Sequence, residues 1–236
     1  MGGYTIYTAI PRRDDDAGRA DRMRRMGVAT MAEAQDKRGL LDPVVRPIQH
    51  GGSVAGPAVT VLMPAGDNLM LHAAIEHLHP GDVLVVTTLA PSVHGVFGEL
   101  LAEACHYRSV AGVVLDTGVR DTAPIRALGL RVWARAVYAG GALKGEAGYV
   151  NVPVTAAGVR VSPGDFVVAD DDGVVVVPRT DADAVLSRAE ERAAREEETR
   201  RRIRGGEISL DLSNLRPVLQ SLGVRYENGP YRPPEH

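Results

Sequence analysis

Two side chains with clear chemical potential, Arg120 and Asp121, follow an apolar run at residues 113–115. The run lies between glycine and threonine-glycine turn signals, which predicts a buried strand that ends at Asp116. Ligands of open α/β sheets bind beyond the carboxyl ends of the strands. Arg120 could grip a carboxylate with its planar fork, and Asp121 offers hard oxygens suited to a cation such as Mg²⁺. A structural role is the alternative, in which Asp121 caps the helix expected over 122–128 and Arg120 pairs with a surface acid.

A second group, Gly98 and Glu99, opens an apolar helix expected over 100–107. The N–H groups of a first helical turn lack partners and attract carboxylates. Glu99 also has a structural explanation, because the helix dipole favours an acid in the first turn. His72 is expected inside a helix over 69–78, where a structural histidine is the simpler interpretation because no second histidine lies one turn away at metal-ligand spacing.

Alternating strand and helix patterns position these groups. Residues 82–137 read as strand, helix, strand, helix, strand, which predicts a parallel layer with right-handed crossovers. Gly118 is expected to make the tight turn after the central strand. The strands before the glycine-rich loop at 140–148 are expected at 58–63, 83–88, 112–115 and 131–137, and the short strands after it at 151–155, 159–161, 166–169 and 174–177.

The resulting fold class is α/β, a single layered domain of the swivelling β/β/α kind. It has a central parallel or mixed sheet, additional short antiparallel strands and a long C-terminal helix. Residues 170–173 are expected to form a hairpin turn. Three adjacent acids there invite a metal-site interpretation, but calcium-loop spacing is absent and turn chemistry explains them.

Helical patterns also occupy both ends of the chain. A helix over 17–26 is expected to end at Gly27, and Thr30 then begins a second helix with Glu33 at its third position, a capping box that explains Glu33 structurally. Near the C-terminus, helices are expected over 181–204 and 210–222. The first of these carries the i,i+4 pairs Glu191–Arg195, Glu196–Arg200, Glu197–Arg201 and Glu198–Arg202. We therefore divide the chain into an N-terminal extension and helix (1–26), a core (27–180) and C-terminal helices that pack on the core or on a neighbouring subunit (181–236).

Composition excludes several classes of protein. The net charge of −3 and the 4% aromatic content give no footprint for nucleic acid, and no apolar run reaches the length of a membrane span. A single cysteine, Cys105, fits a reducing compartment, so we expect a soluble cytoplasmic protein.

The chain has two lysines, Lys37 and Lys144, and neither lies in the motifs above, which disfavours Schiff-base chemistry. Hydrolase, kinase and dinucleotide-binding motifs are absent from the sequence.

The motifs resemble those of the regulator-of-ribonuclease-activity-A-like superfamily. The similarity is carried by AGPAVTV (55–61), GDNLMLH (66–72), GELLAEA (98–104), AGVVLDTGVRD (111–121) and NVPVTAAGVRVSPGDFVVADDDGVVVVP (151–178), and it spans roughly residues 27–222. The most similar branch comprises the metal-dependent pyruvate aldolases that act on 4-hydroxy-4-methyl-2-oxoglutarate and 4-carboxy-4-hydroxy-2-oxoadipate.

The resemblance implies a site for a small 2-oxo dicarboxylic or tricarboxylic acid. It implies that Asp121 holds Mg²⁺ or Mn²⁺ and that Arg120 grips the pyruvoyl group. It also implies that backbone amides of Gly98, Glu99, Leu100 and Leu101 bind the substrate carboxylate. Acids matching Glu33 and Glu196 are expected from an adjacent subunit of a homotrimer or homohexamer with shared active sites. Position 99 is Glu where some of these aldolases have Asp, so the water it orients can sit differently.

The predicted reaction is a class II aldol cleavage to pyruvate, with Arg120, Glu99 and Glu196 as catalytic residues and oxaloacetate decarboxylation as a side activity. An alternative from a different class is a non-catalytic protein that binds and inhibits a ribonuclease, as another branch of the superfamily does. A further alternative is an aldolase or decarboxylase recruited to another 2-oxo acid. Neither the preferred acid nor the native metal follows from the residues.

Overall fold

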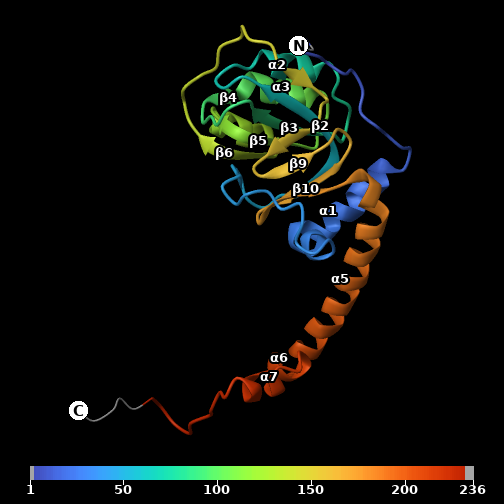
Figure 1. The fold of residues 1–236 in the computed structure, drawn as a ribbon, viewed down its shortest axis with the longest axis vertical. Coiled ribbons are helices and arrows are strands. Elements are labelled where there is room, and N and C mark those ends of the chain that lie inside the picture. The colour runs from blue at the N-terminus through green and yellow to red at the C-terminus, as the bar shows by residue number, and fades with distance from the viewer. Residues whose placement is uncertain (1–2, 232–236) are drawn as a thin grey trace, which may run out of the picture. The chain divides into compact units, whose positions relative to one another are not determined.

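The first of two compact units, Met1–Glu191, is built on a nine-stranded mixed sheet (Figure 1). The computed structural model describes residues 3–231. The strand order is β1-β6-β5-β3-β2-β10-β11, with β4 on β5 and β7 on β2, and β8 and β9 form a separate pair. The strands are β1 (Arg46–Pro47), β2 (Val54–Met63), β3 (Val83–Thr88), β4 (Gly95–Phe97), β5 (Gly112–Val119), β6 (Val132–Val137), β7 (Tyr149–Val150), β8 (Val154–Ala156), β9 (Val159–Val161), β10 (Phe166–Asp170) and β11 (Gly173–Val177).

The predicted α/β class is confirmed, and so is the parallel layer. Strands β2, β3, β5 and β6 are parallel neighbours, whereas β1, β7, β10 and β11 pair antiparallel. Near-continuous apolar strands of this kind suit a sheet that is covered on both faces. The helices that begin in this unit are α1 (Asp16–Glu33), α2 (Leu69–Ile75), α3 (Glu99–Tyr107), α4 (Thr122–Leu128), the 3₁₀ turn Arg179–Asp181 and α5 (Ala182–Arg204).

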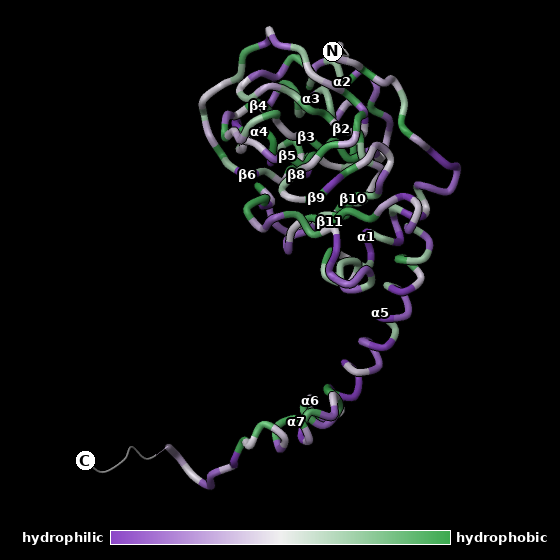
Figure 2. Tube along the Cα trace, in the orientation of Figure 1, coloured by the Kyte–Doolittle hydropathy of each residue, from purple (hydrophilic) through white to green (hydrophobic). Residues whose placement is uncertain are grey.

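Three packed clusters build the core of the first unit. Helices α2, α3 and α4 cover one face of the parallel strands. The other face packs against β8–β11, and the far side of β10 and β11 is covered by α1 and the first turns of α5. In Figure 1, α2 and α3 accordingly lie on one side of the sheet and α1 lies beside β10. Figure 2 shows hydrophobic residues along the central strands, whereas α5 is largely hydrophilic.

The central strand is longer than the sequence predicts. Asp116 does not end β5 but lies inside it, where its carboxylate accepts hydrogen bonds from Arg135 Nε (2.7 Å) and the Ala157 amide (2.7 Å). A charge inside a strand is tolerated when it is paired and hydrogen-bonded in this way. Gly118 is not a turn residue either. A Cβ at that position would lie 2.1 Å from the Val93 carbonyl oxygen, so close approach of the preceding loop requires glycine there.

A kink at Gly27 (φ 76°, ψ 168°) divides α1, as predicted, but the second segment does not begin at Thr30. Its first amide, that of Val28, donates to Asp170 Oδ2 at 2.8 Å. The hairpin between β10 and β11 therefore supplies the cap, and the predicted Thr30 capping box is wrong. Glu33 ends this helix and forms an ion pair with Lys37 at 3.7 Å.

The second unit, Arg192–His236, contains the end of α5, α6 (Ser209–Leu212) and α7 (Arg216–Ser221). The single helix predicted over 210–222 is interrupted at Asn214, which adopts a left-handed conformation (φ 52°). The ion pairs on α5 also differ from those predicted. The second unit has Arg192–Glu196 (2.8 Å) and the i,i+3 pairs Glu197–Arg200 and Glu198–Arg201, because residues three apart are also neighbours on a helix.

Candidate active site

A cavity of about 350 Å³ opens where β4 and β5 end and α3 begins. The Arg120 amide donates to the Phe97 carbonyl at 2.9 Å, which ties the two strand ends together. Six residues predicted from the sequence meet here, from Gly98 to Leu101 and at Arg120 and Asp121. The complete lining is Asn68, His72, Val96, Gly98, Glu99, Leu100, Leu101, Arg120, Asp121 and Lys144.

Asp121 occupies the N-cap position of α4 but does not cap that helix with its side chain. Its backbone is left-handed (φ 55°, ψ 40°), and its Oδ2 instead accepts the amide of Glu99 at 3.2 Å. The carboxylate therefore points towards the start of α3. Strained backbone of this kind persists only where the surroundings impose it, and it clusters at functional sites. The side chain is 44% exposed, so it remains open to a ligand.

Gly98 makes room for that carboxylate. A Cβ at position 98 would lie 2.5 Å from Asp121 Oδ2 and 3.1 Å from Arg120 Nε. The backbone of Gly98 is extended (φ −137°, ψ −171°), a conformation that any residue adopts. Glycine is thus needed at position 98 for the space its missing side chain leaves to the two charged groups.

The Arg120 guanidinium has one carboxylate near it, with Nε 3.6 Å from Asp121 Oδ2. Within residues 3–231, no other acid lies at ion-pair distance from it. The glycine-rich loop after β6 passes beside the other end of the group, because a Cβ on Gly141 would lie 2.7 Å from Nη1. Most of the donor fork is therefore available to an anionic ligand.

The first turn of α3 contributes backbone donors. The first intrahelical bond runs from the Ala102 amide to the Gly98 carbonyl at 3.0 Å, so the amides before it have no helical partner. The amide of Glu99 is taken by Asp121, which leaves those of Leu100 and Leu101. Two adjacent amides at a helix start form a small anion site.

His72 and Lys144, neither of which was assigned to the site from the sequence, also line this cavity. Burial, followed by the positive charge of Lys144, lowers the pKa of His72. Lys144 lies outside the sequence motifs but lines the same cavity as the residues they contain. For His72, the signal was its motif beyond the end of β2, whereas Lys144 lies in a glycine-rich loop whose path has no local sequence signal.

The cavity contains two carboxylates, those of Glu99 and Asp121. In the described part of the chain, no group of three or more His, Cys, Asp or Glu side chains is arranged to hold a metal ion. Asp121, with Glu99 near it in the same cavity, suits Mg²⁺ or Mn²⁺, since Mg²⁺ keeps several waters and takes one or two protein carboxylates. Glu196 is not among the lining residues and belongs to the second unit, and Glu33 lies on α1, so their roles remain predictions.

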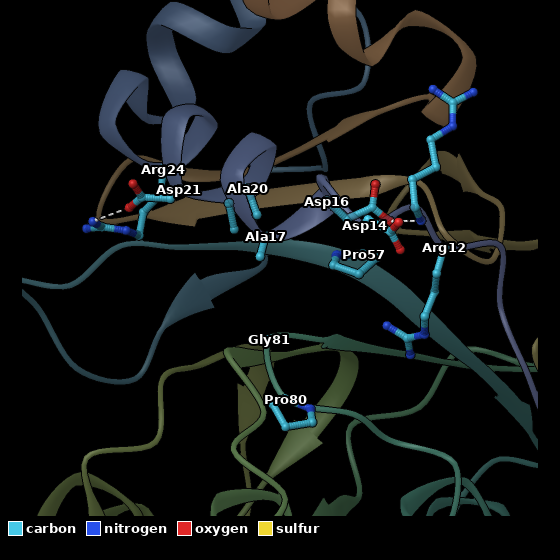
Figure 3. A pocket seen from close by; sticks show the side chains of 12 residues that line it. Arg12, Asp14, Asp16, Ala17, Ala20, Asp21, Arg24, Pro57, Pro80 and Gly81 are labelled. Carbon is cyan, nitrogen blue, oxygen red and sulfur yellow. Dashed lines mark hydrogen bonds and ion pairs between the residues drawn. The ribbon is translucent and has the colours of Figure 1, made fainter.

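A second cavity, between the start of α1 and the turn before β3, is also rich in charge (Figure 3). Most of its charged groups already have protein partners. Arg12 makes two hydrogen bonds to the buried Asp82 (2.7 and 2.8 Å), and Arg24 donates to Asp21 at 2.9 Å. Asp16 accepts two bonds from Arg179. These paired charges hold the N-terminal segment against the sheet, so we interpret this cavity as structural and not as a ligand site.

The sequence and the fold match one family, and the chain belongs to it. The sequence model of the Aldolase/RraA family, described as RraA-like, matches residues 16–176. A relative from Halalkalibacterium halodurans, provisionally named 4-hydroxy-4-methyl-2-oxoglutarate aldolase, is 31% identical over 73% of this chain and 82% of its own length. A relative from Burkholderia multivorans with the same provisional name is 38% identical over 58% of this chain and 83% of its own.

Solved structures include a similar protein with a different description. Streptomyces coelicolor RraAS2, described as an unusual member of the RNase ES inhibitor RraA protein family, superposes with a TM-score of 0.72. It is 32% identical and covers 80% of this chain and 99% of its own. Among residues 3–231, no helix has the length and apolar character needed to cross a membrane.

Proposed function

We propose that the chain is a divalent-metal-dependent pyruvate aldolase. Its substrates are 4-hydroxy-4-methyl-2-oxoglutarate, 4-carboxy-4-hydroxy-2-oxoadipate or both. The observation that carries this proposal is the convergence of Arg120, Asp121 and two unpaired amides of α3 in one cavity. The provisional names of two relatives support the same class of reaction.

The pyruvoyl end of the substrate binds at the start of α3. Its carboxylate accepts hydrogen bonds from the amides of Leu100 and Leu101, and the fork of Arg120 holds the 2-oxo oxygen. Asp121 would hold Mg²⁺ or Mn²⁺ beside Arg120. When bound, the cation supplies Lewis-acid stabilisation of the negative charge that develops on the 2-oxo group.

Bond cleavage then needs one proton removed and one returned. A base takes the proton of the 4-hydroxyl, the C3–C4 bond breaks, and its electron pair enters the enolate of pyruvate. Arg120 stabilises that enolate because its charge is placed before the reaction begins. Glu99 is the proposed proton donor to C3, directly or through a water. Oxaloacetate would lose CO₂ to give the same enolate, which accounts for the expected decarboxylase side activity.

The proposed enzyme is a homotrimer or homohexamer with shared active sites. Glu196, and an acid at the position of Glu33, would come from a neighbouring subunit and act on the other side of the substrate. Support for this part is the resemblance, together with the fact that Glu196 lies in the second unit and is not among the residues that line the cavity.

The second candidate function is ribonuclease inhibition. It is favoured by the likeness to RraAS2, whose description places it in a family of ribonuclease inhibitors. Inhibition of a ribonuclease requires an exposed surface that contacts the enzyme, whereas aldol cleavage requires the cavity that holds the substrate. The two functions therefore respond differently to a change at Arg120.

The test is an assay of pyruvate release from both hydroxy-oxo acids and from oxaloacetate, with Mg²⁺ present. Arg120→Lys should lower kcat/KM on the order of 10²-fold or more, because it keeps the charge but loses the two-pronged grip. Pyruvate release that is absent from the wild type, together with inhibition of a ribonuclease that survives Arg120→Lys, would favour the second function.

A further inference from the structure

A third cavity, of about 560 Å³, lies at the edge of the sheet where β1, β6 and α4 meet. It is lined by the segment 44–50, by the end of β6 and by Arg126 of α4, and it shares no lining residue with the candidate active site. Three of its lining side chains are arginines, Arg46, Arg126 and Arg135, and none is acidic. A concave surface lined by one sign of charge attracts ligands of the opposite sign, in this case anions.

The elements that carry these arginines are held together by backbone groups. Arg46 lies in β1, opposite Ala134 of β6. The amide of Ile48 donates to the Val132 carbonyl of β6 at 2.9 Å, and the carbonyl of Ile48 accepts a hydrogen bond from Arg126 Nε at 2.6 Å. The edge strand, β6 and α4 are therefore connected through one residue. A site built in this way is largely formed before a ligand arrives, which lowers the entropy cost of binding.

The arginines of this cavity carry more charge than the protein balances. Arg135 is paired, because its Nε and Nη2 lie 2.7 and 2.5 Å from Asp116 Oδ1. In the part of the chain that the structure describes, no carboxylate lies at ion-pair distance from Arg46 or Arg126. Two positive charges therefore remain. A phosphoryl group, with a charge of about −1.5 to −2 at pH 7, matches them better than a carboxylate, which carries one charge.

Gln49 and His50 complete the polar lining. Gln49 donates from Nε2 to the Leu130 carbonyl, but its Oε1 is buried and has no hydrogen-bond partner among residues 3–231. A buried acceptor without a donor is costly, and a ligand hydroxyl would satisfy it. His50 Nδ1 lies 3.7 Å from Asp171, an acid outside the lining that also accepts the Gly51 amide at 2.9 Å.

We propose that this cavity binds a small phosphate ester that also carries a hydroxyl group. Arg46 and Arg126 bind the phosphoryl oxygens, for which the planar guanidinium fork is well suited. The hydroxyl donates to Gln49 Oε1, and the carbon chain contacts apolar lining such as Ala136 and Val137. The volume lies within the range of roughly 300–1,000 Å³ that is usual for small-molecule sites. This inference does not depend on the proposed aldolase activity.

The test is calorimetry on the full chain in a buffer free of phosphate and sulfate. The ligands are glycerol 3-phosphate, inorganic phosphate and acetate. Glycerol 3-phosphate should bind about fivefold more tightly than inorganic phosphate, because its hydroxyl groups can satisfy Gln49. Acetate should bind at least about 10-fold more weakly than inorganic phosphate, because it carries one charge and forms fewer charge-assisted hydrogen bonds. The proposal is overturned if glycerol 3-phosphate does not bind, or if it binds no more tightly than inorganic phosphate or acetate.

Substitutions locate the bound anion. Arg46→Met should weaken the binding of glycerol 3-phosphate on the order of 10-fold, because it removes hydrogen bonds between charged groups. Arg160→Met is the matched control and should keep wild-type affinity, since it removes a charge from β9 that likewise has no acid at ion-pair distance within the described residues. Arg120→Met should also keep it. Wild-type affinity in Arg46→Met, or loss of binding in Arg120→Met, would overturn the proposal, and the latter would place the anion in the candidate active site.

Discussion

Replacing Gly98 with alanine should lower activity while leaving the stability of the fold almost unchanged, because position 98 needs a residue without a side chain. The new methyl group would lie 2.5 Å from Asp121 Oδ2, whereas ordinary contact begins at 3.4 Å, so the carboxylate has to retreat by about 0.9 Å. Misplacement of a reacting group by about 1 Å costs on the order of 10²-fold in rate. We therefore expect kcat/KM for pyruvate release to fall about 10²-fold, equivalent to about 2.7 kcal/mol in the barrier.

Stability should change little in the same variant. Gly98 has extended backbone angles that alanine also adopts. Alanine lowers the entropy of the unfolded chain but is a poorer N-cap than glycine, and these terms oppose each other at about 1 kcal/mol or less. Thermal unfolding and circular dichroism measure this, together with Mn²⁺ affinity by calorimetry.

The matched control is Gly18→Ala. Gly18 lies within α1, and a Cβ there would contact nothing within 4 Å. It should keep full activity and gain about 0.5–1 kcal/mol of stability. Gly98→Ala with wild-type kcat/KM would refute the reasoning, because the Asp121 carboxylate would then not need the position observed.

Three further predictions address the metal, the oligomer and the thiol. Asp121→Asn should lose most of its Mn²⁺ affinity in calorimetry and still fold, because asparagine tolerates the left-handed backbone at this position (φ 55°); undiminished Mn²⁺ binding would remove Asp121 as the ligand. Arg120→Ala and Glu196→Ala should each be nearly inactive but regain pyruvate release when co-refolded, because some interfaces then carry both intact residues; a mixture that re-forms oligomers and stays inactive would exclude Glu196. Cys105 is fully buried, and its burial raises the thiol pKa to about 12. At pH 8 the thiol should therefore resist alkylation until the chain is unfolded. Rapid labelling of the folded protein would contradict this prediction.

The sequence predicts those parts of the fold whose signals are local. Strand β3 has the predicted bounds, and the alternation from β3 to β6 holds because each apolar run is short and bounded by turn residues. The end of β5 was misjudged because Asp116 is neutralised by Arg135, a residue on the next strand. The start of the second segment of α1 was misjudged for a similar reason, since its cap is Asp170, 142 positions away from Val28.

The residues of the candidate site also fall into those that local sequence signals identify and those that they do not. Arg120 and Asp121 could be found because they follow a strand directly, and Gly98 because it opens a helix. Lys144 could not, since its loop is placed by the buried carboxylate of Asp67 and not by a pattern of its own. The assignment of Glu196 to a neighbouring site depends on a second copy of the chain, which sequence spacing does not specify.

Metal dependence tests the central claim most directly, because Lys144 lines the cavity and offers the competing imine chemistry. Pyruvate release from 4-hydroxy-4-methyl-2-oxoglutarate should be measured after chelation, after Mn²⁺ is restored, and after borohydride treatment with substrate present. We expect that chelation abolishes activity, that Mn²⁺ restores it, and that borohydride leaves the mass of the chain unchanged. Full activity in chelator, with a borohydride-trapped adduct on Lys144, would contradict it.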